Sequence, residues 1–144
     1  MKMVDVGSKE RTARVAVATG RVRMSARAVA LIRRGKVEKG DVVAAARLAG
    51  VMATKRTPDL IPLCHPISIS GVEVNVKPGP GGVQIRAEVK TVDRTGVEME
   101  ALTAVAAAAL TVYDMLKSTD RGMVVECIQL ERKSGGRSGT WSRS

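Results

Sequence analysis

The chain has 144 residues, 44% of them hydrophobic, which predicts one folded domain with its own core and excludes a disordered chain. Its formal net charge of +10 indicates that a charged partner would be anionic, either a nucleic acid or a phosphorylated small molecule. Because only 1% of the residues are aromatic and the cations are dispersed along the chain, we favour a small polyphosphate over a nucleic acid.

The predicted elements follow from local patterns. Apolar residues alternate in the strands, Ser25 and Asp41 are suitable helix N-caps, and PGPGG at residues 78–82 predicts a hairpin turn. Three prolines within residues 57–66 predict an ordered, extended segment and not a helix. In chain order, the predicted elements are a strand over 15–24, helices over 26–34 and 42–56, the extended segment, strands over 67–77 and 83–92, a helix over 97–116 and a strand over 123–132.

This β-α-α-β-β-α-β order predicts an α+β fold. We expect a ferredoxin-like sandwich, in which helices pack on one face of an antiparallel sheet. The whole chain, residues 1–144, is expected to form this single domain. The polar residues 1–13 and the Gly/Ser-rich residues 134–144 are expected to be mobile.

The helix over 97–116 is the centre of the prediction. Its apolar residues point in most directions, so it must be covered nearly all round, and its alanines allow another backbone to approach closely. We therefore expect a second subunit to pack against it. Glu100 and Asp114 lie about 21 Å apart along the helix axis and cannot share a site within one chain. An antiparallel, two-fold related copy would bring Asp114 of one subunit towards Glu100 of the other, which suggests a composite site at a dimer interface.

Several polar residues could carry chemistry. His65, the only histidine, lies in the proline-rich segment and is either an acid/base or phosphate-binding group or a surface side chain bonded to backbone. Asp114 and Lys117 are neighbours on the helix surface, where an exposed ion pair is the more frequent arrangement and an acid/base pair the alternative. Glu98 and Glu100 stand near the positive end of the helix dipole, which accounts for them without a ligand.

The remaining motifs are weak signals. Cys64 and Cys127 have no CxxC spacing and are expected to be free thiols, and no set of metal ligands is present, so we expect no metal site. KSGGRSG at residues 133–139 is similar to an anion-binding loop, but it has no following helix, so a disordered tail is the default interpretation. No signal peptide or membrane segment is expected, and we interpret the chain as cytoplasmic.

Four longer strings carry a family resemblance. The chain resembles molybdenum cofactor biosynthesis protein C, the cyclic pyranopterin monophosphate synthase family, from residue 3 through the glycine-rich tail. The strings are KRTPDLIPLCHP (55–66), TGVEMEALTA (95–104), TVYDMLK (111–117) and KSGGRSG (133–139). The resemblance implies a ferredoxin-like subunit assembled as a homo-hexamer, a trimer of dimers, with active sites at the dimer interface.

The resemblance also implies an activity. The enzyme would be a phosphorus-oxygen lyase that converts 3′,8-cyclo-7,8-dihydroguanosine 5′-triphosphate to cyclic pyranopterin monophosphate and pyrophosphate. This reaction needs general acids and bases, cations for the triphosphate, and no redox centre. No resident cofactor is implied, and whether Mg²⁺ accompanies the triphosphate stays open.

By position, the resemblance makes Asp114 the active-site aspartate and Lys117 its acid/base partner. The substrate-binding residues that it implies are Leu63, Cys64, His65, Glu98, Met99 and Glu100. The cations that it places near phosphate oxygens or proton transfer are Arg14, Lys39 and Lys133. Arg137 stands where some relatives have Lys, which could change how the loop holds phosphate.

Two rival interpretations remain. A basic, RNA-binding ferredoxin-like domain would need aromatic residues on its central strands, and Val72 and Val74 are not aromatic. A purely structural partner of another enzyme predicts that Asp114→Asn leaves the role of the protein intact, whereas the enzyme interpretation predicts loss of turnover with folding retained.

Overall fold

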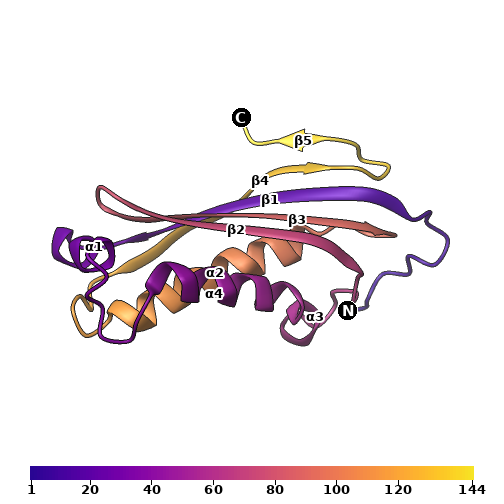
Figure 1. Ribbon diagram of the computed structural model, residues 1–144. Helices are drawn as coiled ribbons and strands as arrows, with labels where there is room; N and C mark the ends of the chain where they lie inside the picture. Colours follow the sequence, from indigo (N-terminus) through magenta and orange to yellow (C-terminus); the bar gives the residue numbers. More distant parts are fainter.

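The computed structural model describes residues 1–144, which form four helices and five strands (Figure 1). In chain order the elements are β1 (Thr12–Arg23), α1 (Ala26–Arg33), α2 (Val42–Thr54), α3 (Thr57–Leu60), β2 (Ile69–Gly79), β3 (Gly82–Asp93), α4 (Glu98–Leu116), β4 (Val124–Ser134) and β5 (Trp141–Ser142).

The strands form one antiparallel sheet in the order β2-β3-β1-β4-β5. β1 is central and pairs with β3 along its whole length, from Thr12 opposite Asp93 to Arg23 opposite Gly82. β4 lies on the other side of β1 and carries β5 at the edge. The split arrangement, with β1 between β3 and β4, confirms the predicted α+β, ferredoxin-like fold.

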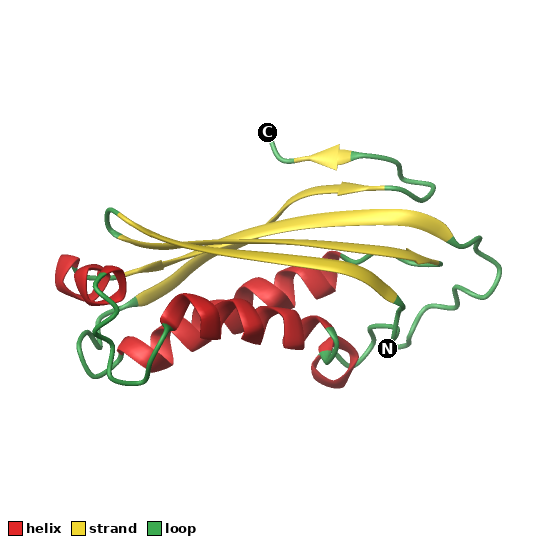
Figure 2. Cartoon of the chain, viewed as in Figure 1, coloured by secondary structure: helices red, strands yellow, loops and turns green.

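Helices α2 and α4 cover one face of the sheet, and α1 lies at one end of the molecule (Figure 2). The alternating strand residues explain this layering, because every second side chain of β3 is buried beneath the helices. The two long helices approach closely at Gly50, where a Cβ would lie 3.1 Å from the carbonyl oxygen of Ala104. Ser25 and Asp41 cap α1 and α2, as predicted.

The face of α4 that points away from the sheet is apolar and uncovered in the single chain. Leu110 is 63% exposed, and the neighbouring helix α2 exposes Leu48 by 60% and Met52 by 56%. α4 is also long and apolar enough to cross a membrane, but its other face packs on the sheet, as in the core helix of a folded domain. This apolar surface of α2 and α4 is the one on which the sequence analysis expects a second subunit to pack.

Two local predictions need correction. The prediction of an extended segment over 57–66 was wrong for its first four residues, because Thr57–Leu60 forms one helical turn, α3. Pro58 is compatible with this turn, since a proline in the first turn of a helix loses no hydrogen bond. The short strand β5 was not predicted at all, although Trp141 pairs with Lys133. The mobility of residues 1–13 and 134–144 stays a prediction.

Candidate active site

The first polar cluster lies at the C-terminal end of α4, beside the loop between α1 and α2. The Asp114 carboxylate accepts hydrogen bonds from Lys39, at 2.7 Å between Nζ and Oδ2, and from Lys117, at 3.0 Å between Nζ and Oδ1. Lys39 comes from the loop, and it lies 75 positions before Asp114 in the chain. The structure thus brings together three of the residues implied by the resemblance.

The two ammonium groups control the charge of this cluster. The hydrogen bonds from Lys39 and Lys117 hold the pKa of Asp114 below its usual range. The carboxylate therefore stays ionised at neutral pH and orients both lysines. All three side chains are about half exposed, between 50% and 52%, so a bound molecule can reach them.

The second cluster surrounds a cavity of about 470 Å³ at the N-terminal end of α4, which we call the His65 cavity. Five of the implied substrate-binding residues line it: Leu63, Cys64, His65, Glu98 and Met99. Its other lining residues are Ile61, Thr95 and Gly96, with Lys2, Val4, Val6 and Lys9 from the N-terminal segment. Half of the twelve lining residues are hydrophobic, which suits a flat ring system with a few polar contacts.

Glu100 lies beneath the His65 cavity and does not line it. Its side chain is 1% exposed, and Cys64 Sγ lies 3.8 Å from Oε1 as a weak donor. Oε2 is buried without a hydrogen-bond partner. Burial raises the pKa of Glu100 to about 6 and also raises the pKa of the Cys64 thiol. Within one chain, Glu100 therefore reaches a ligand only through Cys64 or after a rearrangement.

The third cluster lies where β1 begins, against the KSGGRSG turn. Arg14 donates from Nε to the carbonyl oxygen of Asp93 at 3.2 Å, and from a terminal guanidinium nitrogen to that of Arg94 at 3.3 Å. Gly136 packs directly on this guanidinium, so a side chain at position 136 would collide with it. Lys133 donates to Ser138 across the turn. The glycine-rich turn therefore folds back onto β1.

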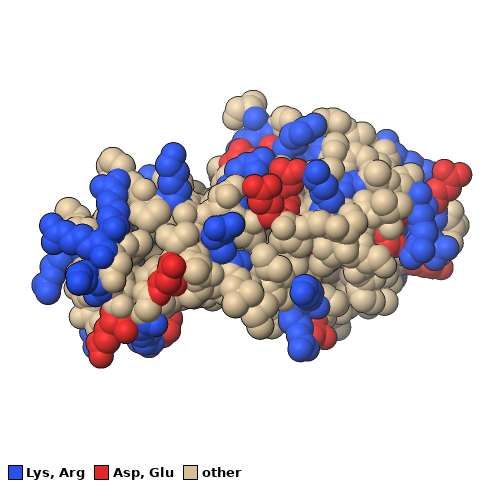
Figure 3. All heavy atoms as spheres, viewed as in Figure 1, with Lys and Arg blue, Asp and Glu red and all other residues tan.

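A second cavity, of about 450 Å³, lies at this turn, and we call it the Arg14 cavity. Its lining residues are Ser8, Lys9, Glu10, Thr12, Arg14, Gly136 and Arg137, none of them hydrophobic. Lys133 does not line it. Figure 3 shows that cationic side chains gather most densely at the end of the molecule that carries α1, and that carboxylates lie among the cations elsewhere on this face.

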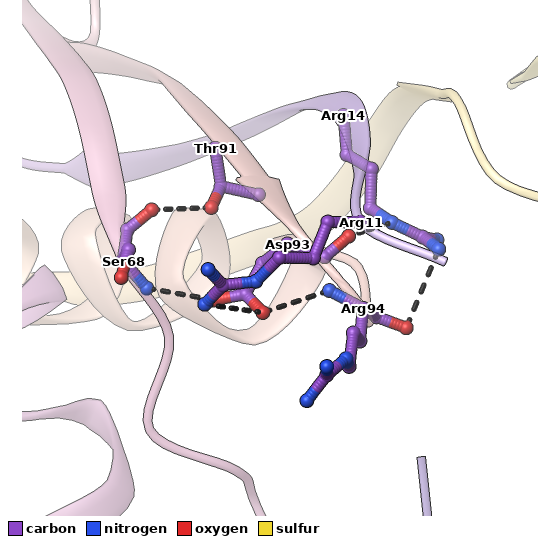
Figure 4. Close-up of polar contacts among 6 residues, drawn as sticks. All are labelled: Arg11, Arg14, Ser68, Thr91, Asp93 and Arg94. Atoms are coloured by element: carbon purple, nitrogen blue, oxygen red, sulfur yellow. Dashed lines mark hydrogen bonds and ion pairs between the residues drawn. The ribbon is translucent and has the colours of Figure 1, made fainter. Parts of the chain in front are cut away.

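Asp93 is a residue that the sequence analysis missed (Figure 4). Its carboxylate accepts hydrogen bonds from the backbone N–H of Ser68, at 2.9 Å, and of Arg94, at 2.8 Å. These bonds, that of Ser68 foremost, hold its pKa below the usual range. Asp93 thereby fixes the segment that follows His65 to the end of β3. The available signal was an Asp between a strand and the Gly96 turn, a typical position for capping backbone N–H groups.

The three clusters do not form one site within one chain. The Asp114 cluster and the His65 cavity lie at opposite ends of α4, about 21 Å apart for residues 100 and 114. Arg14 lines the Arg14 cavity at the start of β1, away from the Asp114 cluster. No three His, Cys, Asp or Glu side chains lie close enough together to hold a metal ion.

Comparison with known proteins identifies the family. The model of the MoaC family matches residues 3–136. The chain is 59% identical to the cyclic pyranopterin monophosphate synthase of Streptomyces avermitilis, covering 99% of this chain and 84% of that protein. It is 60% identical to the synthase of the same name from Thermomicrobium roseum, covering 99% and 87%, and 59% identical to that of a Nocardioides species, covering 99% and 89%. The chain belongs to the MoaC family.

Proposed function

We propose that this chain is a cyclic pyranopterin monophosphate synthase, a lyase of molybdenum cofactor biosynthesis. Its substrate is 3′,8-cyclo-7,8-dihydroguanosine 5′-triphosphate, and its products are cyclic pyranopterin monophosphate and pyrophosphate. The names of relatives that match nearly the whole chain support this function. The observation that carries it in the structure is the contact of Asp114 with Lys39 and Lys117.

The Asp114 cluster has the parts that the reaction needs. Opening and rebuilding rings requires proton transfer, and closing a cyclic phosphate with loss of pyrophosphate requires cations that stabilise negative charge. Asp114 stays ionised and orients the ammonium groups of Lys39 and Lys117. In this arrangement Lys117 is the acid/base group, Asp114 holds it in place, and Lys39 is a second cation for phosphate oxygens or proton transfer.

A second subunit would complete the site. The uncovered side chains of Leu48, Met52 and Leu110 give α2 and α4 an apolar surface suited to a copy of the same chain. An antiparallel pairing of α4 would bring the Asp114 cluster of one subunit towards the His65 cavity of the other. We propose a homo-hexamer, a trimer of such dimers, working in the cytoplasm.

The binding groups are divided between the two cavities. The half-apolar His65 cavity would take the fused rings of the substrate, with Glu100 beneath it acting through Cys64. On the phosphate side, Arg14 would contribute from the Arg14 cavity and Lys133 from the adjacent glycine-rich turn, outside the cavity lining. The proposal includes no resident cofactor, and Mg²⁺ would enter only with the triphosphate.

The test is turnover of the cyclic dihydro-GTP by the wild-type chain and by Lys117→Ala, with the assembly state measured alongside. We expect product from the wild type and none from a mutant of the same assembly state. A wild-type protein that forms no product but binds RNA tightly would instead support a basic binding module.

A further inference from the structure

Thr91 is the one polar side chain in the buried row of β3. It is only 2% exposed, and the other buried side chains of this strand are apolar: Val83, Ile85, Ala87 and Val89. A buried hydroxyl group lowers stability unless it is hydrogen-bonded. Valine is also β-branched and would continue the apolar row, so the hydroxyl group distinguishes Thr91 from its neighbours through the bond that it makes.

The hydroxyl group of Thr91 bonds to a segment that is distant in sequence. It donates to the backbone carbonyl oxygen of Ser68, which precedes β2 (Figure 4). The other two buried threonines, Thr54 and Thr57, donate to carbonyl oxygens only three and four residues earlier in the chain. Thr91 therefore joins β3 to the end of the segment that contains His65, whereas the other two hydroxyl groups are satisfied locally.

Ser68 is held at both polar groups of its backbone. Its N–H donates to the Asp93 carboxylate at 2.9 Å, and its carbonyl oxygen accepts from Thr91. Thr91 and Asp93 are two residues apart on β3, so both side chains project from the same face of the strand. Figure 4 shows both of them directed at Ser68. We call this pair of hydrogen bonds the Ser68 anchor.

The Ser68 anchor has few competitors for control of the segment. Residues 65–68 make no backbone-to-backbone hydrogen bond, although the side chain of Ile67 packs against the core. The only other hydrogen bond to these residues is a weak one from the Cys64 thiol to the carbonyl oxygen of His65. The backbone path between His65 and β2 is thus fixed mainly at Ser68.

The connection from the Ser68 anchor to His65 is short and stiff. Pro66 has a fixed φ and no N–H, and it restricts His65, the residue before it, to extended conformations. His65 lines the His65 cavity, and it also lines a neighbouring cavity of about 450 Å³ together with Ser68 and Asp93. A displacement of Ser68 is therefore expected to move the imidazole in the wall of the His65 cavity.

We propose that Thr91 is a positioning residue for His65. Its hydroxyl group, together with the Asp93 carboxylate, holds Ser68 and so fixes the imidazole in the wall of the His65 cavity. Thr91 is buried and lines neither the His65 cavity nor its neighbour, so it acts only through the backbone of Ser68. The identity of the substrate rests on the proposed function, whereas the Ser68 anchor does not depend on it.

The first measurement is backbone hydrogen exchange of residues 65–70 in the assembled, full-length protein, which needs no turnover. Thr91→Val stays β-branched but removes the donor, and we expect exchange in this stretch to become about five- to tenfold faster. Thr91→Ser keeps the hydroxyl group and should exchange nearly as the wild type does. The matched control is Thr54→Val, which removes a similarly buried hydroxyl group from α2 and should leave residues 65–70 unchanged.

Kinetics with the nucleotide-derived substrate test the consequence for the site. We expect Thr91→Val to raise KM about tenfold with little change in kcat, because the His65 cavity binds the substrate in the ground state as well as in the transition state. Thr91→Ser should restore most of the loss, and Thr54→Val should leave KM as in the wild type.

Three results would overturn the inference. They are unchanged exchange of residues 65–70 in Thr91→Val, faster exchange with an unchanged KM, and an equal rise of KM in Thr91→Val and in the Thr54→Val control. A wild type that forms no product would refute the proposed function, while faster exchange in Thr91→Val would still support the Ser68 anchor.

Discussion

The two ends of α4 place carboxyl groups in opposite environments. Asp114, at the C-terminal end, is half exposed and bonded to two ammonium groups, which keep its pKa low. Glu100, at the N-terminal end, is buried against a thiol, and its pKa is raised to about 6. Carboxyl groups whose pKa values are pushed apart can take different parts in one reaction. One helix thus carries a fixed negative charge at one end and a titratable group at the other.

The largest expected effect concerns Asp114, at the C-terminal end of α4. Asp114→Asn removes the charge that orients Lys39 and Lys117, and we expect kcat to fall by about 100-fold or more, as for loss of general acid/base catalysis. Because Asp114 is exposed, urea unfolding should change little. The control is Asp59→Asn, another exposed Asp paired three residues away with a cation, Arg56. A similar loss of kcat in both variants would contradict a special role for Asp114.

The next effect concerns Glu100, at the N-terminal end of α4, and is measured as a change of stability with pH. The pKa of Glu100 is raised from 4.5 to about 6 in the folded state. The penalty for burying the ionised carboxylate is therefore absent below pH 4.5, and stability falls as pH rises from 4.5 through 6. We expect the free energy of unfolding of the wild type, relative to Glu100→Gln, to decrease by about 2 kcal/mol across this range. Urea titrations between pH 4 and 8 measure the difference. An unfolding free energy that differs between the two proteins by the same amount at every pH would show that Glu100 is not perturbed.

A smaller effect concerns Asp93, which anchors the segment after His65 near the N-terminal end of α4. Asp93→Ala leaves the N–H groups of Ser68 and Arg94 without their acceptor, which should cost about 1 kcal/mol of stability. We also expect a higher KM, because the segment after His65 loses its anchor. Asp59→Ala is the control, since that carboxylate makes only an exposed ion pair. Unchanged KM in Asp93→Ala would separate this anchor from substrate binding.

The smallest effect concerns the thiol above Glu100. Cys64→Ser replaces a weak donor to Glu100 Oε1 by a stronger one, which favours the ionised carboxylate. We expect the pH midpoint of the stability change to move to lower pH by about a few tenths of a unit. Cys127→Ser, at an exposed cysteine of β4, should leave the midpoint unchanged. A shift to higher pH in Cys64→Ser would show that the hydroxyl does not reach Glu100.

Much of the fold could be predicted because its signals are local. The caps at Ser25 and Asp41, the alternation in β2 and β3, and the alanine-rich helix each depend on residues close in sequence. The free state of both cysteines also followed from their spacing. β5 was not predicted, because a strand of two residues is too short to show an alternation of apolar and polar residues and depends on its pairing with β4.

The candidate site was less accessible to sequence reasoning, because its contacts are long-range. The spacing of Asp114 and Lys117 showed that they are neighbours, but the contact with Lys39 depends on how the loop between α1 and α2 meets α4. Helical spacing placed Glu100 near the helix start, but the burial of its carboxyl group beside Cys64 depends on tertiary packing. The family resemblance supplied these residues by position, and the structure adds their environments.

The pairing of β5 with β4 gives the protein a built-in optical reporter. Trp141 is the only tryptophan of the chain, so its fluorescence reports on the tail alone. Its ring lies 5.6 Å from the guanidinium carbon of Arg143, and its backbone pairs with Lys133 beside the glycine-rich turn. Docking or release of the tail, including any caused by a phosphate-bearing ligand at that turn, can therefore be followed in solution without an attached label.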